Sequence, residues 1–278
     1  MSENAPFGAL APSSAQETAR RLAASLPANW FGRKTVSLLL GPAGGRRRRA
    51  FDVTVFGTQK ARLHPYDNLC EKRVYIAPQL WEGTERAALG AAIAASDDDT
   101  FFFLDIGANA GLYALFARSA AQQAGRRLSA ACVEPAPDML ARLAFNIAAS
   151  GAGEDVRVLP YAAAGADGSL RFAVDAANRG ESHLDETGEM VVEARTVLRL
   201  LSEWGAPRVD ALKIDIEGHE FPVLDAFLRD APPALLPGLV VMEFSHEAEN
   251  APAAARLLGA GYREKLRTKR NLVAVRDA

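Results

Sequence analysis

The stretch FFFLDIGANAGLYALFAR, residues 101–118, decides the fold of this chain. Its first six residues form an apolar run of strand length with an acid, Asp105, near its end, and glycines punctuate the turn that follows. From Gly111 onward the apolar residues recur at helical spacing. A strand, a glycine turn and a helix in this order are typical of a nucleotide-binding site in an α/β protein.

The composition limits the class of protein. The 278 residues suffice for one large α/β domain with a small appendage, and 49% hydrophobic with 24% charged residues is ordinary for a globular protein. The formal net charge of −2 does not suggest a protein built to hold polyanions. Two cysteines cannot form a disulfide framework, no apolar run is long enough to span a bilayer, and no secretory signal is visible. We expect a cytoplasmic protein without a membrane span.

The chain divides by its pattern into an N-terminal extension and a larger domain. Within residues 1–80, a short helix is expected around 16–26, and TVSLLL (35–40) and FDVTVFG (51–57) predict a β-hairpin around a glycine-rich turn. The arginine run 46–49 then lies in a solvated turn. Within residues 81–278, strands alternate with helices, which predicts a largely parallel sheet covered on both faces. The expected strands of this domain are FFFLDI, LSAACVEP, EDVRVLP, SLRFAVD, VDALKIDI, GLVVMEFS, YREKL and NLVAV.

The glycine turn distinguishes two kinds of ligand. A dinucleotide site requires G-x-G-x-x-G, whose middle glycine lets the backbone approach a pyrophosphate, but Asn109 stands between Gly107 and Gly111. Asp105 would also repel a diphosphate. S-adenosylmethionine instead carries a cationic sulfonium and an ammonium group, which an acid favours, and a carboxylate that the amides of the turn can receive. An NAD(P)-dependent oxidoreductase with an unusual loop stays open as an alternative.

Acids also close two further strands. Glu134 ends LSAACVEP and is placed to accept hydrogen bonds from the ribose hydroxyls of an adenosine. VDALKIDIEGHEFPVL places Asp215 at the rim of the sheet and Glu217 and His219 just after it. Ligands of such sheets bind outside the carboxyl ends of the strands, so we expect these residues to share one site. The structural alternatives are a helix N-cap for Asp215 and a first-turn acid for Glu217.

With these blocks in place, the sequence resembles the FkbM-type family of S-adenosylmethionine-dependent methyltransferases. The resemblance covers roughly residues 60–275, and its most specific motif is KIDIEGHE. The other blocks that carry it are HPYDNLCEKRVYIAPQLWEGTERAAL, LDIGANAGLYAL, VEPAPDMLARLAFNI, PYAAAGADGSLRF, ARTVLRLL and LVVMEFS. It implies a class I methyltransferase fold, which is Rossmann-like with a mostly parallel seven-stranded sheet. It also implies S-adenosyl-L-methionine as cofactor, S-adenosyl-L-homocysteine as product, and methyl transfer to oxygen, or to nitrogen, of a small molecule.

The resemblance further implies which residues hold the cofactor. They are Asp105, Gly107, Ala108, Asn109 and Gly111 on the methionine side, Glu134 at the ribose with Pro135 shaping the adjacent turn, Ala162 at the adenine, and Glu82 at the ammonium group.

The acids and histidines that follow the strands are candidates for catalysis. Because an alcohol acceptor has a high pKa, a positioned base raises the rate by roughly 10²–10⁴-fold, and the candidates are Asp215, Glu217 and His219. His183 can cover the acceptor, and His246 is a second candidate base. A metal is not predicted, because Asp215 and Glu217 are one residue apart on an extended stretch and should point to opposite faces.

The methyl acceptor and the partners are predicted only by class. The chain lacks the Asn/Asp-Pro-Pro-aromatic block that would hold a flipped base, so no nucleic-acid partner is expected. The expected acceptor is a small molecule, a glycan or a natural product. The N-terminal hairpin is a candidate contact for a homodimer. A non-catalytic adenosine-ligand binding protein is the second alternative.

Overall fold

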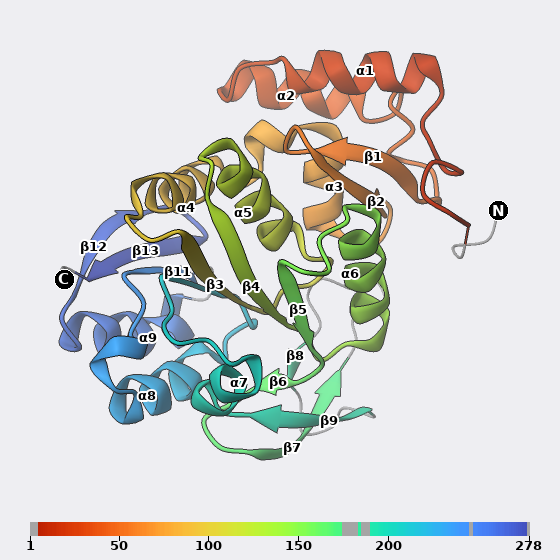
Figure 1. The fold of residues 1–278 in the computed structure, drawn as a ribbon. Helices are drawn as coiled ribbons and strands as arrows, with labels where there is room; N and C mark the ends of the chain where they lie inside the picture. The colour runs from red at the N-terminus through yellow and green to blue at the C-terminus, as the bar shows by residue number, and fades with distance from the viewer. Residues whose placement is uncertain (1–4, 174–182, 185–189, 245–246, 277–278) are drawn as a thin grey trace.

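The structure, a computed structural model, describes residues 5–173, 183–184, 190–244 and 247–276 (Figure 1). The α-helices are α1 (Ser14–Ala24), α2 (Trp30–Leu39), α3 (Leu69–Ile76), α4 (Gly83–Ala95), α5 (Leu112–Gln123), α6 (Pro137–Ala149), α7 (Val197–Trp204), α8 (Glu220–Asp230) and α9 (Glu247–Gly259). The strands are β1 (Phe51–Val55), β2 (Gln59–Leu63), β3 (Thr100–Ile106), β4 (Arg127–Val133), β5 (Val156–Leu159), β6 (Ala162–Ala163), β7 (Gly168–Ala173), β8 (His183–Leu184), β9 (Met190–Arg195), β10 (Ala211–Ile214), β11 (Leu239–Glu243), β12 (Tyr262–Arg267) and β13 (Asn271–Arg276). Two 3₁₀ turns are η1 (Pro78–Leu80) and η3 (Pro233–Leu235).

A seven-stranded sheet in the order β12-β13-β11-β10-β3-β4-β5 forms the centre of the molecule. β3 pairs in parallel with β10 on one side and with β4 on the other, so the strand order reverses at β3. Only β13 runs antiparallel to its neighbours β11 and β12. This topology confirms the predicted class I methyltransferase fold. The reversal places the ligand-binding crevice at the carboxyl ends of β3, β4 and β10.

Helices cover both faces of this sheet (Figure 1). Along β3, Phe101 and Phe103 belong to the core under α4, α5 and α6, whereas Leu104 and Ile106 belong to the core under α7, α8 and α9. A strand covered on both sides is apolar along nearly its whole length, which is why FFFL reads as a continuous run. The two cores hold the carboxyl ends of the central strands in fixed positions.

The N-terminal region differs from the predicted hairpin. TVSLLL is not a strand but the end of α2, a helix that begins after Asn29, whose side chain accepts a hydrogen bond from the Gly32 amide at 2.9 Å. The strand predicted at 51–57 forms as β1, and its partner is β2. The prediction was wrong because a short run of Thr, Val and Leu fits either period, and the cap that starts the helix lies outside the run.

The hairpin β1–β2 shares the core under α5 and α6, to which Phe51 and Leu63 contribute fully buried side chains. The arginine run follows α2, and Arg46, Arg47 and Arg48 are exposed, as expected. A boundary between domains at residue 80 stays a prediction.

A second, smaller sheet in the order β6-β9-β7-β8 stands beyond β5. The predicted strand SLRFAVD supplies most of β7, which pairs with β9 and β8 in this sheet. Within the described part of the chain, no helix combines the length and the apolar character needed to cross a membrane.

Candidate active site

The turn between β3 and α5 depends on three residues in the left-handed backbone region. These are Gly107 at φ 74°, Asn109 at φ 53° and Gly111 at φ 80°. A Cβ atom on residue 107 would lie 1.9 Å from the carbonyl oxygen of Asp215, so only glycine fits. The Asn109 Oδ1 accepts a hydrogen bond from the Ala110 amide at 2.8 Å, a local bond that suits asparagine to this conformation.

The segment around α3, in the N-terminal extension, also holds this turn in place. Asn68 caps α3 by accepting a hydrogen bond from the Glu71 amide at 3.0 Å, and its Nδ2 donates to the Asn109 Oδ1 at 2.8 Å. The buried Glu71 carboxylate in turn accepts from the His64 amide at 2.7 Å and from Arg142 of α6 at 2.7 Å. Helix α3 is therefore fixed both to the turn after β3 and to the helix after β4.

After β10 the chain makes a second turn that faces the first. Glu217 adopts φ 54°, and Gly218 follows at φ 95°. Glu220 is buried and accepts a hydrogen bond from the Ile216 amide at 2.9 Å, which closes this turn onto α8. His219, not Asp215, occupies the N-cap position of α8, so the structural alternatives for Asp215 and Glu217 are wrong.

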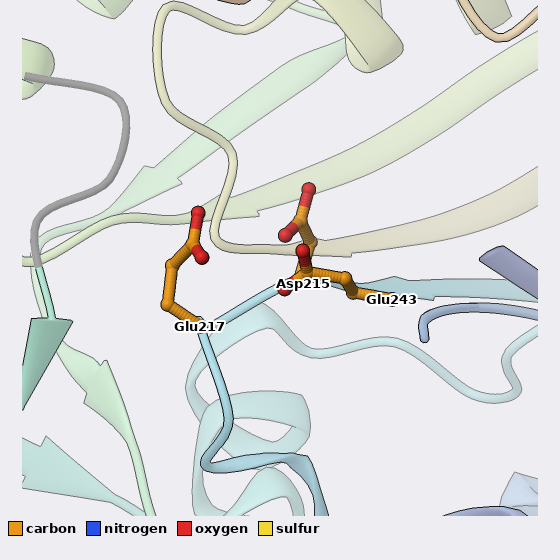
Figure 2. Close-up of side chains that lie close together, drawn as sticks. All are labelled: Asp215, Glu217 and Glu243. Carbon is orange, nitrogen blue, oxygen red and sulfur yellow. The ribbon is translucent and has the colours of Figure 1, made fainter. Parts of the chain in front are cut away.

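Three carboxylates gather where the second turn meets the end of β11 (Figure 2). Asp215, Glu217 and Glu243 each place one oxygen within 4.8 Å of the others. The expectation that Asp215 and Glu217 point to opposite faces is therefore wrong: residues two positions apart on an extended stretch share a face, and the turn at Glu217 leaves both side chains lining the cavity beside Glu243. Such a group has the composition of a divalent-cation site, but exposed or partly exposed acids also cluster without a metal.

A buried lysine offsets part of this negative charge. The Lys213 Nζ lies 3.0 Å from the Asp215 Oδ2 and 3.9 Å from the Asp105 Oδ1, and it donates to the Gly107 carbonyl at 3.2 Å. Burial alone would lower the pKa of Lys213, but the carboxylates of Asp215 and Asp105 outweigh it and raise that pKa. Burial would raise the pKa of Asp215, but Lys213 outweighs it and lowers that pKa. Both groups are therefore charged at neutral pH.

Two further acids lie beneath the turn after β3. Asp105 is fully buried, and burial raises its pKa to about 6. Glu134 is also buried, which raises its pKa to about 7 although its carboxylate accepts hydrogen bonds from the Asn109 amide at 2.8 Å and the Ala136 amide at 2.9 Å. Glu134 thus ties the turn after β3 to the end of β4.

Glu82, at the start of α4, lies at the same site as Asp215 and Lys213. It is the N-cap residue of α4, adopts φ 42°, and accepts a hydrogen bond from the Tyr113 hydroxyl at 2.6 Å. Burial and the charge of Asp215 raise the pKa of Glu82. Cys70 lies nearby, and burial raises the pKa of its thiol to about 12, which keeps the thiol neutral and excludes it as a base at neutral pH.

One cavity is lined by Lys213, Glu82 and the three clustered carboxylates. It spans about 740 Å³, open solvent included. Its lining contains six of the predicted site residues, namely Glu82, Gly107, Ala108, Asn109, Asp215 and Glu217. The other predicted residues lie outside this lining: Asp105, Gly111, Glu134, Pro135, Ala162 and His219.

The predicted residues outside the lining have definite places. Gly111 is the N-cap of α5, and a Cβ atom there would lie 2.4 Å from a methyl group of Leu143. Ala162 is buried in β6 and packs with Ala136, two residues after Glu134. The backbone of His183 forms part of β8, and His246 lies outside the described residues.

The sequence prediction missed several residues that line the cavity. They are Leu69, Cys70, Trp81, Leu112, Tyr113, Lys213, Glu243, Arg270 and Asn271. Two had a signal in the sequence. Lys213 stands two residues before Asp215 on a strand and so shares its face, and Glu243 ends an apolar strand just as Asp105 and Glu134 do.

Comparison with known proteins shows to which family the chain belongs. The sequence profile described as the methyltransferase FkbM domain matches residues 105–264, which is more than half of the chain and includes both turns. The chain belongs to the FkbM methyltransferase family. It is a methyltransferase, its cofactor is S-adenosylmethionine, and the NAD(P)-dependent reading is wrong. A comparison with curated protein sequences finds no match.

One solved structure supports the fold of this FkbM methyltransferase, and a second aligns less closely. The METTL16 methyltransferase domain aligns with a TM-score of 0.50 and 12% identity over 94% of this chain and 80% of that one. The FkbM methyltransferase of Methylobacillus flagellatus aligns with a TM-score of 0.46 and 11% identity over 94% of this chain and 58% of that one. At these identities the likeness concerns the fold alone.

The residues present in this FkbM methyltransferase fit its cofactor. Position 107 admits no side chain, so the backbone there is bare, and the turn leads directly into the N-terminus of α5, where a carboxylate is favoured. The cavity lining carries four carboxylates against two cations, Lys213 and Arg270. An acidic cavity favours a ligand with sulfonium and ammonium groups.

Proposed function

We propose that this methyltransferase acts on a hydroxyl oxygen of a small molecule, a glycan or a natural product, with Asp215 as the proton acceptor. The observation that carries the proposal is the Asp215–Lys213 pair. Asp215 is kept ionised by an ammonium 3.0 Å away, it lines the cavity, and its own carbonyl packs on Gly107 of the turn that receives the cofactor. An alcohol, unlike a neutral amine, is a poor nucleophile until a base takes its proton.

The cofactor supplies an electrophilic methyl group when it is bound. Its ammonium group would lie against Glu82, whose carboxylate the Tyr113 hydroxyl orients. Its ribose would lie against Glu134, whose two hydrogen bonds to backbone amides fix the carboxylate while lone pairs stay available for hydroxyl donors. Gly107, Ala108 and the further residues of this turn would border its methionine, whose carboxylate the N-terminus of α5 would receive. Pro135 would shape the turn beside the ribose, and Ala162 would border the adenine.

The acceptor hydroxyl would lie beside Asp215, opposite the turn after β3. Lys213 holds the base in its charged form and fixes its direction by ion pairing. Glu217 and Glu243 are close enough to share the proton once it is taken. His219 stays a candidate base at the N-cap of α8, outside the cavity lining.

The experiment combines binding and turnover. S-adenosylhomocysteine is titrated into the protein by calorimetry, and labelled S-adenosylmethionine is then incubated with a panel of alcohols, sugars and amines. We expect Asp215→Asn to lower turnover by about 10²–10⁴-fold with unchanged affinity for S-adenosylhomocysteine. Glu154→Gln removes an exposed acid far from the cavity and serves as the matched control.

Three results would overturn parts of this proposal. Full turnover in Asp215→Asn would remove Asp215 as the base, and the same assay on Glu217→Gln and His219→Gln would then show which group replaces it. Products methylated only on nitrogen would assign an N-methyltransferase. Tight binding of S-adenosylhomocysteine with no transfer to any acceptor would favour a non-catalytic adenosine-ligand binding protein.

We also propose a cytoplasmic homodimer that forms through α1 and α2. The support is an apolar surface on these two helices, where Leu22, Trp30, Phe31 and Leu38 are 53–74% exposed. Light scattering on the wild type and on Trp30→Ser/Leu38→Ser tests the dimer. A wild-type monomer at high concentration would reject it.

A further inference from the structure

A second opening adjoins the acidic cavity. We call it the basic cleft; it spans about 1240 Å³ including open solvent, and Glu82 and Arg270 line both it and the cavity. Its charged lining residues are Arg33 of α2, Arg73 of α3, Glu82 and Glu85 at the start of α4, and Lys269 and Arg270 in the β12–β13 turn. The cleft therefore lies between the N-terminal extension and the last hairpin of the sheet.

The two carboxylates of the basic cleft are already engaged with neutral donors. Glu85 is buried and accepts hydrogen bonds from the Thr268 hydroxyl at 2.7 Å and the Asn271 Nδ2 at 3.0 Å, which holds the β12–β13 turn against α4. Glu82 accepts from the Tyr113 hydroxyl. Neither forms an ion pair with the arginines of the cleft in the part of the chain that the structure describes.

The four cationic side chains of the basic cleft have no such hydrogen-bond partners among the described residues. Among the described residues, the side chains of Arg33, Arg73, Lys269 and Arg270 form neither a hydrogen bond nor an ion pair. Arg73 is partly buried, and burial together with the charges of Arg270 and Arg33 lowers its pKa. Partly buried guanidinium groups are normally paired, as Arg142 is here with Asp67 and Glu71. Within the described chain Arg73 lacks such a partner, and the exposed Arg33 and Arg270 add their positive charge beside it at the edge of the cleft, which indicates a site for an anion.

The backbone adds to this preference. Helix α4 begins at the cleft, and its N-cap residue, Glu82, makes no side-chain capping bond, so the first amides of the helix stay available to an acceptor. The amide end of a helix and nearby arginines together form a strong environment for a carboxylate or a phosphate, which arginine binds in two-pronged geometry.

We propose that the basic cleft binds an oxyanion group of the methyl acceptor, so that the substrate is an anionic small molecule or glycan whose hydroxyl reaches Asp215. This inference rests on the proposed function and narrows its acceptors to anionic ones. The acidic cavity would repel an anion, so the negative group of an acceptor is best held on the far side of Glu82 and Arg270. Cofactor and acceptor are thereby separated by charge, since the cation binds among carboxylates and the anion among guanidiniums.

The first test measures oxyanion binding without turnover. Thermal unfolding of the protein saturated with S-adenosylhomocysteine is followed in sodium phosphate, sodium glucuronate, or sodium chloride of equal ionic strength. We expect phosphate or glucuronate to raise the unfolding temperature above that in chloride. Arg73→Gln and Arg270→Gln should each weaken this response by about tenfold in ligand concentration, whereas Arg48→Gln, a control at an exposed arginine outside the cleft, should not.

Unchanged responses in Arg73→Gln and Arg270→Gln, or no response of the wild type to either anion, would overturn the inference. An RNA oligonucleotide forms a third arm. If RNA binds in an Arg73-dependent manner while phosphate and glucuronate do not, the cleft serves a polynucleotide and the inference is wrong. Arg73→Lys retains the charge and should restore part of the response, which separates a binding role from a folding defect.

The second test separates this inference from the proposed function. Methyl transfer is compared among glucose, glucuronate and glucose 6-phosphate as matched acceptors, which also distinguishes a carboxylate from a phosphate. We expect Arg73→Gln to raise the KM for the charged acceptors by about 10–100-fold with kcat nearly unchanged. Transfer to glucose alone, insensitive to Arg73→Gln, would reject the inference and keep the function. Oxyanion binding without transfer to any acceptor would reject the function and keep the site.

Discussion

Replacing Lys213 by methionine is the sharpest test of the electrostatics of the site. Methionine keeps most of the side-chain volume but removes the ammonium that lies 3.0 Å from Asp215 and 3.9 Å from Asp105. At an effective dielectric constant of about 20, these contacts correspond to attractions of about 5 and 4 kcal/mol before the cost of burying the lysine is subtracted. Removing one partner of a buried ion pair costs about 3–5 kcal/mol in net stability, and we expect that loss at about pH 8.

The loss should depend on pH with a definite sign. Without Lys213, burial raises the pKa values of Asp105 and Asp215 in the folded state above those in the unfolded state. The folded protein then holds protons that the unfolded chain releases, so its stability falls as pH rises above the unfolded value of about 4. Of these two acids, only Asp105 behaves in this way in the wild type, because Lys213 lowers the pKa of Asp215. The stability difference should therefore shrink to about 1–2 kcal/mol at about pH 5.

Urea unfolding followed by circular dichroism at the two pH values measures this difference. Lys265→Met, at an exposed lysine on β12, is the matched control and should change little. The double variant Lys213→Met/Asp215→Asn also removes one of the two carboxylates that lose their ion-pair partner in Lys213→Met. It should therefore recover part of the stability at the higher pH. A difference that is equal at both pH values, or a Lys213→Met protein as stable as the wild type, would refute the electrostatic reasoning.

Three further variants test separate contacts. Gly107→Ala forces a Cβ atom to within 1.9 Å of the Asp215 carbonyl at φ 74°, so it should cost at least about 2 kcal/mol, seen as a lower thermal midpoint, and abolish S-adenosylhomocysteine binding by calorimetry. Asp105→Asn should stabilise the unliganded protein by up to about 3 kcal/mol at about pH 8, because the pKa of this buried acid is raised from 3.8 to about 6; equal stability of both proteins there would contradict this. Tyr113→Phe removes the hydrogen bond that lowers the pKa of Glu82, so S-adenosylhomocysteine should bind about tenfold more weakly at neutral pH, and an unchanged affinity would exclude Glu82 as a cofactor ligand.

The sequence predicts the central sheet well because its strands are marked locally. Both faces of β3 are buried, so FFFL is apolar throughout, and β4, β10 and β11 are likewise buried along most of their length and mainly apolar. The acids at the ends of these strands follow from the same rule, which places ligand-binding residues at carboxyl ends. Applied without exception, that rule also selects Glu243, whose neighbour Met242 pairs with Ile214 just before Asp215.

The rest of the site depends on contacts between distant segments. Arg270 and Asn271 reach the cavity because Glu85, more than 180 residues earlier, holds the β12–β13 turn by two hydrogen bonds. Arg73 reaches the cleft because α3 is anchored by Asn68 to Asn109. No periodicity or motif in a single segment encodes such pairings, so the acceptor side of the site is visible only in the folded protein.

The conformations of the site explain why local rules failed there. Four described residues other than glycine have left-handed backbones, and three of them, Glu82, Asn109 and Glu217, line the same cavity. For glutamate this conformation costs about 1–2 kcal/mol relative to an extended or helical one, so it persists only where surrounding contacts impose it. Local preference would extend the chain from Asp215 to Glu217, and the fold departs from it at Glu217, where it gathers three carboxylates. The backbone strain and the acidic cavity therefore have the same origin: three separate segments leave their preferred conformations where they meet around one cavity.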